Sequence, residues 1–363
     1  MHPNDLLNLK DQNKIEDTSK DKGVFTRNEI YSQPEAWKDA IDVLIRQKAE
    51  IRDFQHINGD QQVIFSGCGS TYYLSCAAST LFQEMIGYAA KGVPASELWL
   101  SSKVYFGKIN PSIMIFISRS GETSETILAC ELFRKNQKGK IITLVCQPGS
   151  TLSRMGDLNL TFPSGLEQSV AQTRAFSTLY LATVGLSAIW ANEDHLFDEL
   201  SILPGKASRI IDMYRNLAIE YGNNLGYDRI YFLGSGSRYG LASELSLKMK
   251  EMSLTHSEAF HFLEFRHGPK SMVSSQALII GLVSETNAIH ELAVLSDVQK
   301  LGGKVISIGE NNTDILINSG VKEVFRNILY LPFCQMLAYE RAITKNLDPD
   351  RPTNLEAVVK LRM

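Results

Sequence analysis

The segment 63–74, V-I-F-S-G-C-G-S-T-Y-Y-L, decides the fold class of this chain. It begins with apolar residues that favour a strand and continues through small and hydroxylated residues into an apolar pattern of helical spacing. A short buried strand that passes through a glycine-rich turn directly into a helix is typical of the first unit of an α/β fold. The segment therefore predicts a strand over 61–65 and a helix over 72–86.

The same alternation continues along the first half of the chain. Strand patterns occur at 95–100, 112–117, 140–145 and 159–162, and helical patterns occur at 35–54, 125–136 and 177–190. Strands that alternate with helices pair in parallel, and helices cover both faces of the resulting sheet. The first half is thus predicted to be a doubly wound parallel sheet.

The second half repeats the first. The segment 230–241, I-Y-F-L-G-S-G-S-R-Y-G-L, matches 63–74 at one offset of 167 residues (234 − 67, from the first glycine of each motif). Further strand patterns at 277–284 and 304–308 correspond to those at 112–118 and 140–144. We therefore expect an α/β protein with two tandem doubly wound parallel-sheet domains, which meet near Leu203-Pro204-Gly205.

These patterns divide the chain into successive parts. The predicted parts are a disordered lead-in at 1–24, a helical segment at 25–58, a first domain at 59–202, a second domain at 203–345, and a C-terminal tail at 346–363 that closes the site.

Composition limits the function classes. A chain of 363 residues with 44% apolar and 21% charged residues is an ordinary globular protein, and a net charge of −3 leaves no basic surface for nucleic acid. No apolar run reaches the roughly 20 residues of a membrane span, and the N-terminus lacks an apolar signal region. The five cysteines form no C-x-x-C pair, which indicates a reducing compartment. We expect a cytoplasmic protein with no nucleic-acid or membrane partner.

Two loops rich in hydroxyl groups mark a candidate ligand site. The sequences S-G-C-G-S-T at 66–71 and S-R-S-G-E-T at 118–123 each follow a predicted strand and lead into a helix. The carboxyl ends of parallel strands face the ligand crevice, and helix N-termini attract anions. Either loop alone is explained as a tight turn between a strand and a helix. Two such loops at corresponding ends of the sheet favour a ligand site, and because no lysine lies nearby, the favoured ligand is a phosphate monoester held by neutral donors. The second half keeps only Ser284-Glu285-Thr286 at this place, so one site per chain is predicted.

Other ligand patterns are missing. Tyr72 stands where a dinucleotide-binding motif needs its third glycine, and the chain has neither a G-x-x-x-x-G-K-[ST] phosphate loop nor a G-x-S-x-G motif. His256 and His261 have no metal-binding spacing with the neighbouring carboxylates. We expect no cofactor and no metal.

The segment 248–269 gathers groups that can move protons. Lys248 and Glu251 are three residues apart in a helical pattern and therefore share a helix face, while His267 precedes the helix-breaking Gly268-Pro269. A carboxylate, an ammonium and an imidazole together suit proton transfer near neutral pH. A helix with a solvated charged edge and a loop histidine would give the same pattern, so this segment alone does not decide between the two interpretations.

Taken together, the loops at 66–71 and 118–123 and the stretch K-M-K-E…E-F-R-H-G-P resemble the sugar isomerase (SIS) family over 25–363. The chain is similar to the isomerase half of glucosamine-6-phosphate synthase. It is more similar to the galactosamine-6-phosphate deaminase/isomerase group, often called tagatose-6-phosphate ketose/aldose isomerase. The resemblance implies flavodoxin-like SIS domains.

The resemblance also assigns roles. Glu251 matches the base that moves a proton between C1 and C2, Lys248 stands beside it, and His267 matches a ring-opening histidine supplied by the neighbouring subunit, which implies a homodimer or higher oligomer. The residues implied to hold the sugar phosphate are Cys68, Gly69, Ser70, Thr71, Ser118, Arg119, Ser120, Thr123, Val170 and Gln172.

The implied reaction converts a hexosamine 6-phosphate to a ketohexose 6-phosphate and ammonia. The alternatives are an isomerase of a non-amino sugar phosphate, a fructosamine-phosphate deglycase and a non-catalytic sugar-phosphate sensor. Two departures from the synthase pattern argue against the synthetic direction. There is no room for its glutamine-hydrolysing domain before Phe25, and Ala357 stands where the synthase has a lysine, with Lys360 three residues further on.

Overall fold

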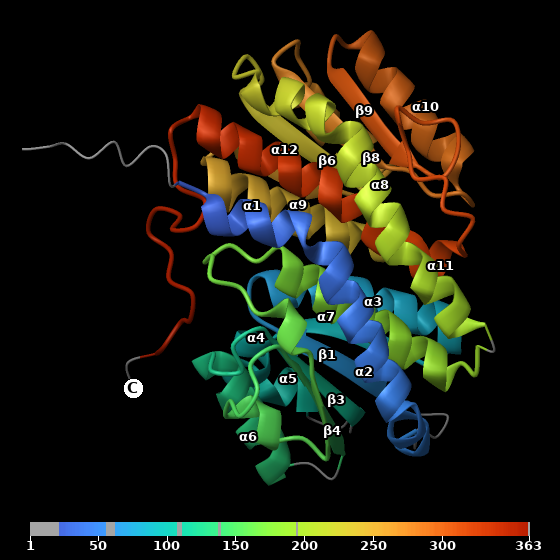
Figure 1. Cartoon of the computed structure of the whole chain (residues 1–363), viewed down its shortest axis with the longest axis vertical. Helices are drawn as coiled ribbons and strands as arrows, with labels where there is room; N and C mark the ends of the chain where they lie inside the picture. Colours follow the sequence, from blue (N-terminus) through green and yellow to red (C-terminus); the bar gives the residue numbers. More distant parts are fainter. Residues whose placement is uncertain (1–21, 56–61, 107–110, 137–138, 194, 362–363) are drawn as a thin grey trace, which may run out of the picture.

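The computed structural model describes residues 22–55, 62–106, 111–136, 139–193 and 195–361 (Figure 1). It contains two five-stranded parallel sheets, with strand orders β2-β1-β3-β4-β5 and β10-β9-β8-β6-β7. The first sheet consists of β1 (Gln62–Gly67), β2 (Ala90–Pro94), β3 (Pro111–Ser118), β4 (Lys140–Val145) and β5 (Leu158–Thr161). The second consists of β6 (Arg229–Leu233), β7 (His256–Phe260), β8 (Ala277–Leu282), β9 (Lys304–Gly309) and β10 (Ile315–Leu316).

The two sheets have the same topology, which confirms the predicted α/β fold with two doubly wound sheets. Read from the other edge, the second sheet runs β7-β6-β8-β9-β10 and matches the first strand by strand. The helices after the first strand of each half, α3 (Ser70–Ile86) and α9 (Ser237–Ser253), begin and end at the same offset of 167 residues (237 − 70 and 253 − 86). The duplication seen in the sequence is thus a duplication of structure.

The remaining α-helices surround the sheets and fill the space between them (Figure 1). In the first half they are α1 (Val24–Tyr31), α2 (Gln33–Asp53), α4 (Ala95–Leu100), α5 (Ser102–Phe106), α6 (Ser124–Asn136) and α7 (Arg174–Trp190). Later in the chain they are α8 (Leu196–Asn223), α10 (Ala288–Lys300), α11 (Glu323–Arg326) and α12 (Leu331–Thr344).

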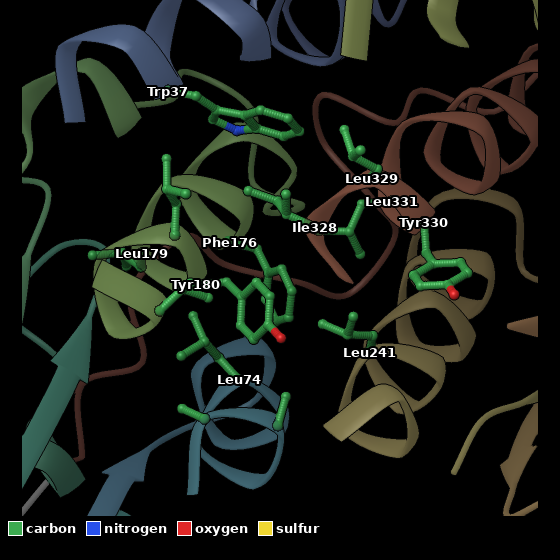
Figure 2. Close-up of a cluster of buried hydrophobic side chains, with 14 of the residues drawn as sticks. Trp37, Leu74, Phe176, Leu179, Tyr180, Leu241, Ile328, Leu329, Tyr330 and Leu331 are labelled. Atoms are coloured by element: carbon green, nitrogen blue, oxygen red, sulfur yellow. The ribbon is translucent and has the colours of Figure 1, made fainter. Parts of the chain in front are cut away.

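One hydrophobic core joins the two halves. Helix α7 is buried at every residue from Ala175 to Trp190, as expected for a helix that is apolar on all sides. Figure 2 shows its residues Phe176 and Tyr180 beside Leu74 of α3 and Leu241 of α9, so side chains from both halves pack in one cluster. The relative position of the two sheets is therefore fixed by burial rather than by a linker.

One local prediction was wrong. Residues 95–100 form helix α4 and not a strand, and the edge strand is β2, which ends at Pro94. Ala95 and Leu98 are buried three residues apart whereas Leu100 is exposed, which is a helical pattern and not the alternation of a strand. Leu203-Pro204-Gly205, near which we expect the two domains to meet, lies inside α8, and that helix packs against α2 of the first half and α12 of the second.

The segment 248–269 also contains an element that the sequence did not reveal. Strand β7 occupies 256–260 at the edge of the second sheet, between the end of α9 and the turn that carries His267. Within the described residues no helix combines the length and the apolar character needed to cross a membrane.

The contact between α3 and α9 predicts the effect of a small substitution. A Cβ at Gly240 would lie 2.5 Å from the backbone nitrogen of Ala77 and 2.7 Å from the carbonyl oxygen of Tyr73. Because these are backbone atoms, Gly240→Ala can be accommodated only if the two helices separate. We expect the variant to lower the free energy of unfolding by about 1–3 kcal/mol in urea denaturation.

Gly205→Ala is the matched control, because a Cβ at Gly205 in α8 meets no atom within 4 Å. Alanine has the higher helix propensity, so this variant should be as stable as the natural protein or more stable by roughly 0.5–1 kcal/mol. Equal stability of the two variants would show that the α3–α9 contact is not tight.

Candidate active site

The hydroxyl-rich loops lie side by side at the carboxyl end of the first sheet. The loop of 67–71 connects β1 to α3, the loop of 118–123 connects β3 to α6, and β1 and β3 are neighbours. The chain leaves these two strands in opposite directions across the sheet, and such a switch point is where open α/β sheets bind ligands. A Cβ at Gly67 would lie 2.4 Å from Oγ1 of Thr71 and 2.8 Å from the carbonyl oxygen of Ile117, so only glycine lets the first loop turn here.

The loop hydroxyls are used in different ways. Thr71 accepts a hydrogen bond from the backbone N–H of Cys68 and donates one to its carbonyl, both at 2.9 Å, so its hydroxyl closes the turn. Ser118 and Ser120 instead accept backbone N–H groups of Gly121 and Glu122, at 3.0 and 3.2 Å. A hydroxyl that accepts from the backbone keeps its own proton for a ligand. Ser118 and Ser120 therefore keep a hydroxyl proton that Thr71 has already used.

A cavity of about 180 Å³ opens beside these loops and collects most of the predicted site residues. Its walls include nine of them: Cys68, Gly69, Ser70, Arg119, Thr123, Val170, Gln172, Lys248 and Glu251. Thr71, Ser118 and Ser120 stand in the supporting loops and not on the wall. His267 is exposed and lies outside the cavity of its own chain.

A larger cavity, of about 490 Å³, lies beside α1 and includes Glu29 and Arg174 on its wall. It contains none of the predicted site residues. We place the candidate site in the smaller cavity because the loops of the first half and the charged face of α9 meet there.

Helix α9 contributes three charged groups, one of which the sequence analysis missed. Lys248 is 1% exposed and forms an ion pair with Glu251 and a second one, at 3.5 Å, with the fully buried Glu244. Burial raises the pKa of Glu244 to about 8, although the positive charge of Lys248 opposes that rise. Burial by itself lowers the pKa of Lys248, but the two carboxylates outweigh it and the net shift is upward. Near neutral pH, Glu244 is therefore largely protonated and Lys248 stays charged.

The sequence contains one feature that could have identified Glu244 as a site residue, namely its spacing from Lys248. Glu244 precedes Lys248 by four residues, the distance at which side chains on a helix meet. Burial, which makes its proton affinity unusual, cannot be seen from spacing.

Arg119 has a different role from that of a simple anion donor. Its guanidinium is buried and donates to the carbonyl oxygens of Ser169, Val170 and Ala357, each at 3.0 Å. It also lies 3.6 Å from the carboxylate of Glu167. Arg119 thus ties the 169–170 segment and the C-terminal tail to the second loop.

The C-terminal tail forms one wall of the cavity. The N–H of Ser124 donates to the carbonyl of Val359 at 3.3 Å, and the N–H of Val170 donates to the carbonyl of Asp350 at 2.9 Å. The tail residues on the wall are Leu355, Glu356, Ala357 and Val359. Lys360 is exposed and is not among the residues of the wall.

The Cys68 thiol and possible metal ligands are further candidates for the reactive groups of the site. Burial raises the pKa of the Cys68 thiol to about 11, so the thiolate is scarce near neutral pH. In the described part of the chain, no three His, Cys, Asp or Glu side chains come together as metal ligands would.

Comparison with known proteins identifies the family. The model of the SIS domain matches residues 56–189 and 226–328, which are the two halves described above. The chain belongs to the SIS domain family. Both matched segments include the first strand of a half and the helix that follows it.

Several curated relatives of this SIS chain are glutamine–fructose-6-phosphate aminotransferases (isomerizing). The one from Thermococcus kodakarensis is 29% identical over 355 residues, which cover 91% of this chain and 57% of the relative. The one from Helicobacter pylori is 31% identical over 386 residues, which cover 96% of this chain and 63% of the relative. The chain thus spans less than two thirds of the length of these relatives.

Solved structures have the same fold as this SIS chain. A glucosamine-6-phosphate deaminase from Thermotoga maritima superposes with a TM-score of 0.80 at 27% identity, covering 93% of this chain and 99% of that one. A tagatose-6-phosphate ketose/aldose isomerase from Escherichia coli gives a TM-score of 0.83 at 20% identity, covering 92% and 96%. The second likeness concerns the fold alone.

The buried carboxyl of Glu244 predicts a pH-dependent stability difference. Between the ordinary pKa of 4.5 and about 8, the unfolded chain has lost the Glu244 proton that the folded chain keeps. Stability of the natural protein should therefore fall as the pH rises through this window, by up to about 1.4 kcal/mol per pH unit from this group. Glu244→Gln removes the titration, so its stability relative to the natural protein should increase steadily with pH in urea denaturation.

Glu258→Gln, at an exposed carboxylate, serves as the control and should show a nearly constant difference from the natural protein. A pH-independent difference for Glu244→Gln would contradict the raised pKa.

Proposed function

We propose that this SIS chain is an aminosugar-6-phosphate deaminase/isomerase, which converts a hexosamine 6-phosphate to a ketohexose 6-phosphate and ammonia. The observation that carries the proposal is the Lys248–Glu251 ion pair, which opens onto a cavity walled on the other side by the hydroxyl-rich loops. A proton-transfer group and hydroxyl-rich loop residues thus line the same cavity, of about 180 Å³.

The loops supply the phosphate site in this proposal. Ser70 is the first residue of α3, Ser124 is the first residue of α6, and Thr123 directly precedes that helix, so the two helix N-termini point toward the same crevice. The positive ends of these helix dipoles attract an anion, and the hydroxyl protons of Ser118 and Ser120 can donate to phosphate oxygens. Arg119 supports this surface from behind by holding the 169–170 segment and the tail.

Glu251 is the proposed base. In the open-chain aldehyde form it takes the proton from C2, which gives an enolamine, and returns a proton to C1, which gives the C2 ketimine and a C1 alcohol. Water then adds to C2 and ammonia leaves, so that one water is consumed for each ammonia released. The Glu251 side chain is 19% exposed, whereas Lys248 is 1% exposed, so the carboxylate reaches the cavity while the ammonium orients it from within the protein.

Glu244 completes this arrangement. If both carboxylates beside Lys248 were ionised, the ammonium would be shared between them. Because burial keeps Glu244 largely protonated, the charge of Lys248 is directed mainly to Glu251. Glu244 is a positioning residue in this proposal and does not contact the substrate.

Ring opening is assigned to His267 of a neighbouring copy of the chain. His267 is exposed, in the turn after β7, and does not line the cavity of its own chain. A homodimer that brings this turn to the cavity of its partner would supply an imidazole for moving a proton between O5 and O1.

The same proton shuttle serves a sugar with a hydroxyl at C2, so a plain aldose–ketose isomerase is the second candidate. Glucosamine 6-phosphate, galactosamine 6-phosphate, their N-acetylated forms and the corresponding hexose phosphates form the test panel. Ammonia release from an amino sugar supports the proposal. Isomerisation of hexose phosphates without any ammonia release would replace it with the second candidate.

Replacing the proposed base should separate chemistry from binding. Glu251→Gln keeps the size and hydrogen-bonding capacity of the side chain but cannot take up the C2 proton. We expect ammonia release to fall by about 10²–10⁴-fold, the usual contribution of a general base, while the Kd for the sugar phosphate changes by less than about threefold. Glu258→Gln, at an exposed carboxylate outside the cavity, should leave both unchanged. Full turnover by Glu251→Gln would contradict the assignment.

Mixed dimers test the origin of His267. Glu251→Gln and His267→Ala should each be inactive alone. After the two variants are unfolded together and refolded, about half of the dimers contain one copy of each, and one of their two sites is then intact. If His267 acts on the partner's site, activity should return to about one quarter of the natural level. No recovery would place His267 in the site of its own chain.

A further inference from the structure

The second half of the chain contains a loop built like the second hydroxyl-rich loop of the first half. Strand β8 leads through Ser284-Glu285-Thr286 into α10, as β3 leads through Ser118-Arg119-Ser120 into α6. In both loops the serine accepts the backbone N–H three residues ahead, from Asn287 at 2.9 Å and from Gly121 at 3.0 Å. The two loops therefore share this serine hydrogen bond, although the residue that donates differs in backbone conformation, with φ +65° at Gly121 and −113° at Asn287.

The carboxylate of Glu323 occupies this second loop. Its Oε2 accepts the backbone N–H groups of Glu285 and Thr286, both at 3.2 Å, and the Thr286 hydroxyl at 3.1 Å. Its Oε1 accepts from Nη1 of Arg238 at 2.5 Å. Consecutive N–H groups, a hydroxyl and a guanidinium around one anionic group form the donor set that phosphate oxygens also require.

Arg238 places a buried cation beside the loop, at a repeat position where the first half has Thr71. It stands at the position of Thr71 in the repeat (238 − 71 = 167), directly after the first residue of α9. The side chain is 8% exposed, and its Nε has no hydrogen-bond partner among the described residues. Its other carboxylate neighbour is Glu291, at 4.0 Å, which also accepts the N–H of Ser284. The guanidinium is therefore buried, with its bonds made to carboxylates and one of its donors unused.

The repeat also places a carboxylate opposite this loop. Glu84 of α3 corresponds to Glu251 of α9 at the same offset (251 − 84 = 167). Burial raises the pKa of Glu84, with Arg238 opposing and Glu323 adding to that rise, so these three groups lie near one another. The position of Lys248 is taken by Leu81, however, so the ion pair of the first site is not repeated. The surroundings of this loop therefore do not repeat the proposed chemistry.

We propose that the second half retains an anion-binding cradle, formed by Glu285, Thr286 and Arg238, and that the carboxylate of Glu323 occupies it in place of a phosphate group. The cradle is the counterpart of the first-half loops. Because the Glu323 carboxylate fills it, only the first-half site of the described chain is open. Glu323 is already an anion in these surroundings, so a phosphate monoanion would replace one negative charge with another. Removing that carboxylate opens a second phosphate site.

Calorimetric titration of the full-length protein with inorganic phosphate tests the proposal. We expect Glu323→Ala to bind one more phosphate per chain than the natural protein, and we expect Arg238→Gln in the same background to abolish the additional site. Because the result is a difference between variants, it does not depend on whether the first-half loops bind phosphate. Failure of the proposed function and failure of this inference are thus distinguishable.

Glu323→Gln is the matched control. It removes the same charge but leaves a side chain of the same size in the cradle, so it should bind no additional phosphate. An additional site in Glu323→Gln would mean that phosphate responds only to the altered charge and would overturn the inference, as would an unchanged count in Glu323→Ala. If Glu323→Ala does not fold, Glu323→Ser replaces it with the same expected results.

Discussion

The close contact between α3 and α9 is the constraint on which the candidate site depends. The hydroxyl-rich loop before α3 belongs to the first half, whereas Lys248 and Glu251 belong to the second, and the two can meet only if these helices pack backbone to backbone. Gly240, which lies against Ala77 and Tyr73, allows that approach. The shared core around α7 then packs against both helices, so the two halves that form the site belong to one hydrophobic core.

Burial gives the charges on α9 different properties. A lone buried ammonium would be strongly unfavourable, and two ionised carboxylates beside it would repel each other. The arrangement resolves both problems because Glu244 is fully buried and largely protonated, while Glu251 reaches the cavity. Two glutamates that look alike in the sequence thereby become a positioning group and a candidate base.

The corresponding loops of the two halves differ in the groups that lie beside them. In the first half, the tail and Arg119 surround an open cavity beside the loops. In the second half, Glu323 and Arg238 occupy the corresponding loop and bond to each other. The same sheet topology therefore supports an open cavity in one copy and an internal ion pair in the other, so the duplicated fold presents one candidate active site among the described residues.

The sequence by itself determined the duplicated α/β fold, the loops at the switch point and the Lys248–Glu251 pair, because these features depend on local spacing and on a repeat that can be read directly. It did not determine that 95–100 is a helix or that α8 continues through Pro204, because these depend on packing between segments distant in the chain. The protonation of Glu244 and the position of Glu323 were likewise decided by tertiary structure. Proton affinity follows burial, and the partner of a carboxylate follows which remote groups the fold brings within hydrogen-bonding distance.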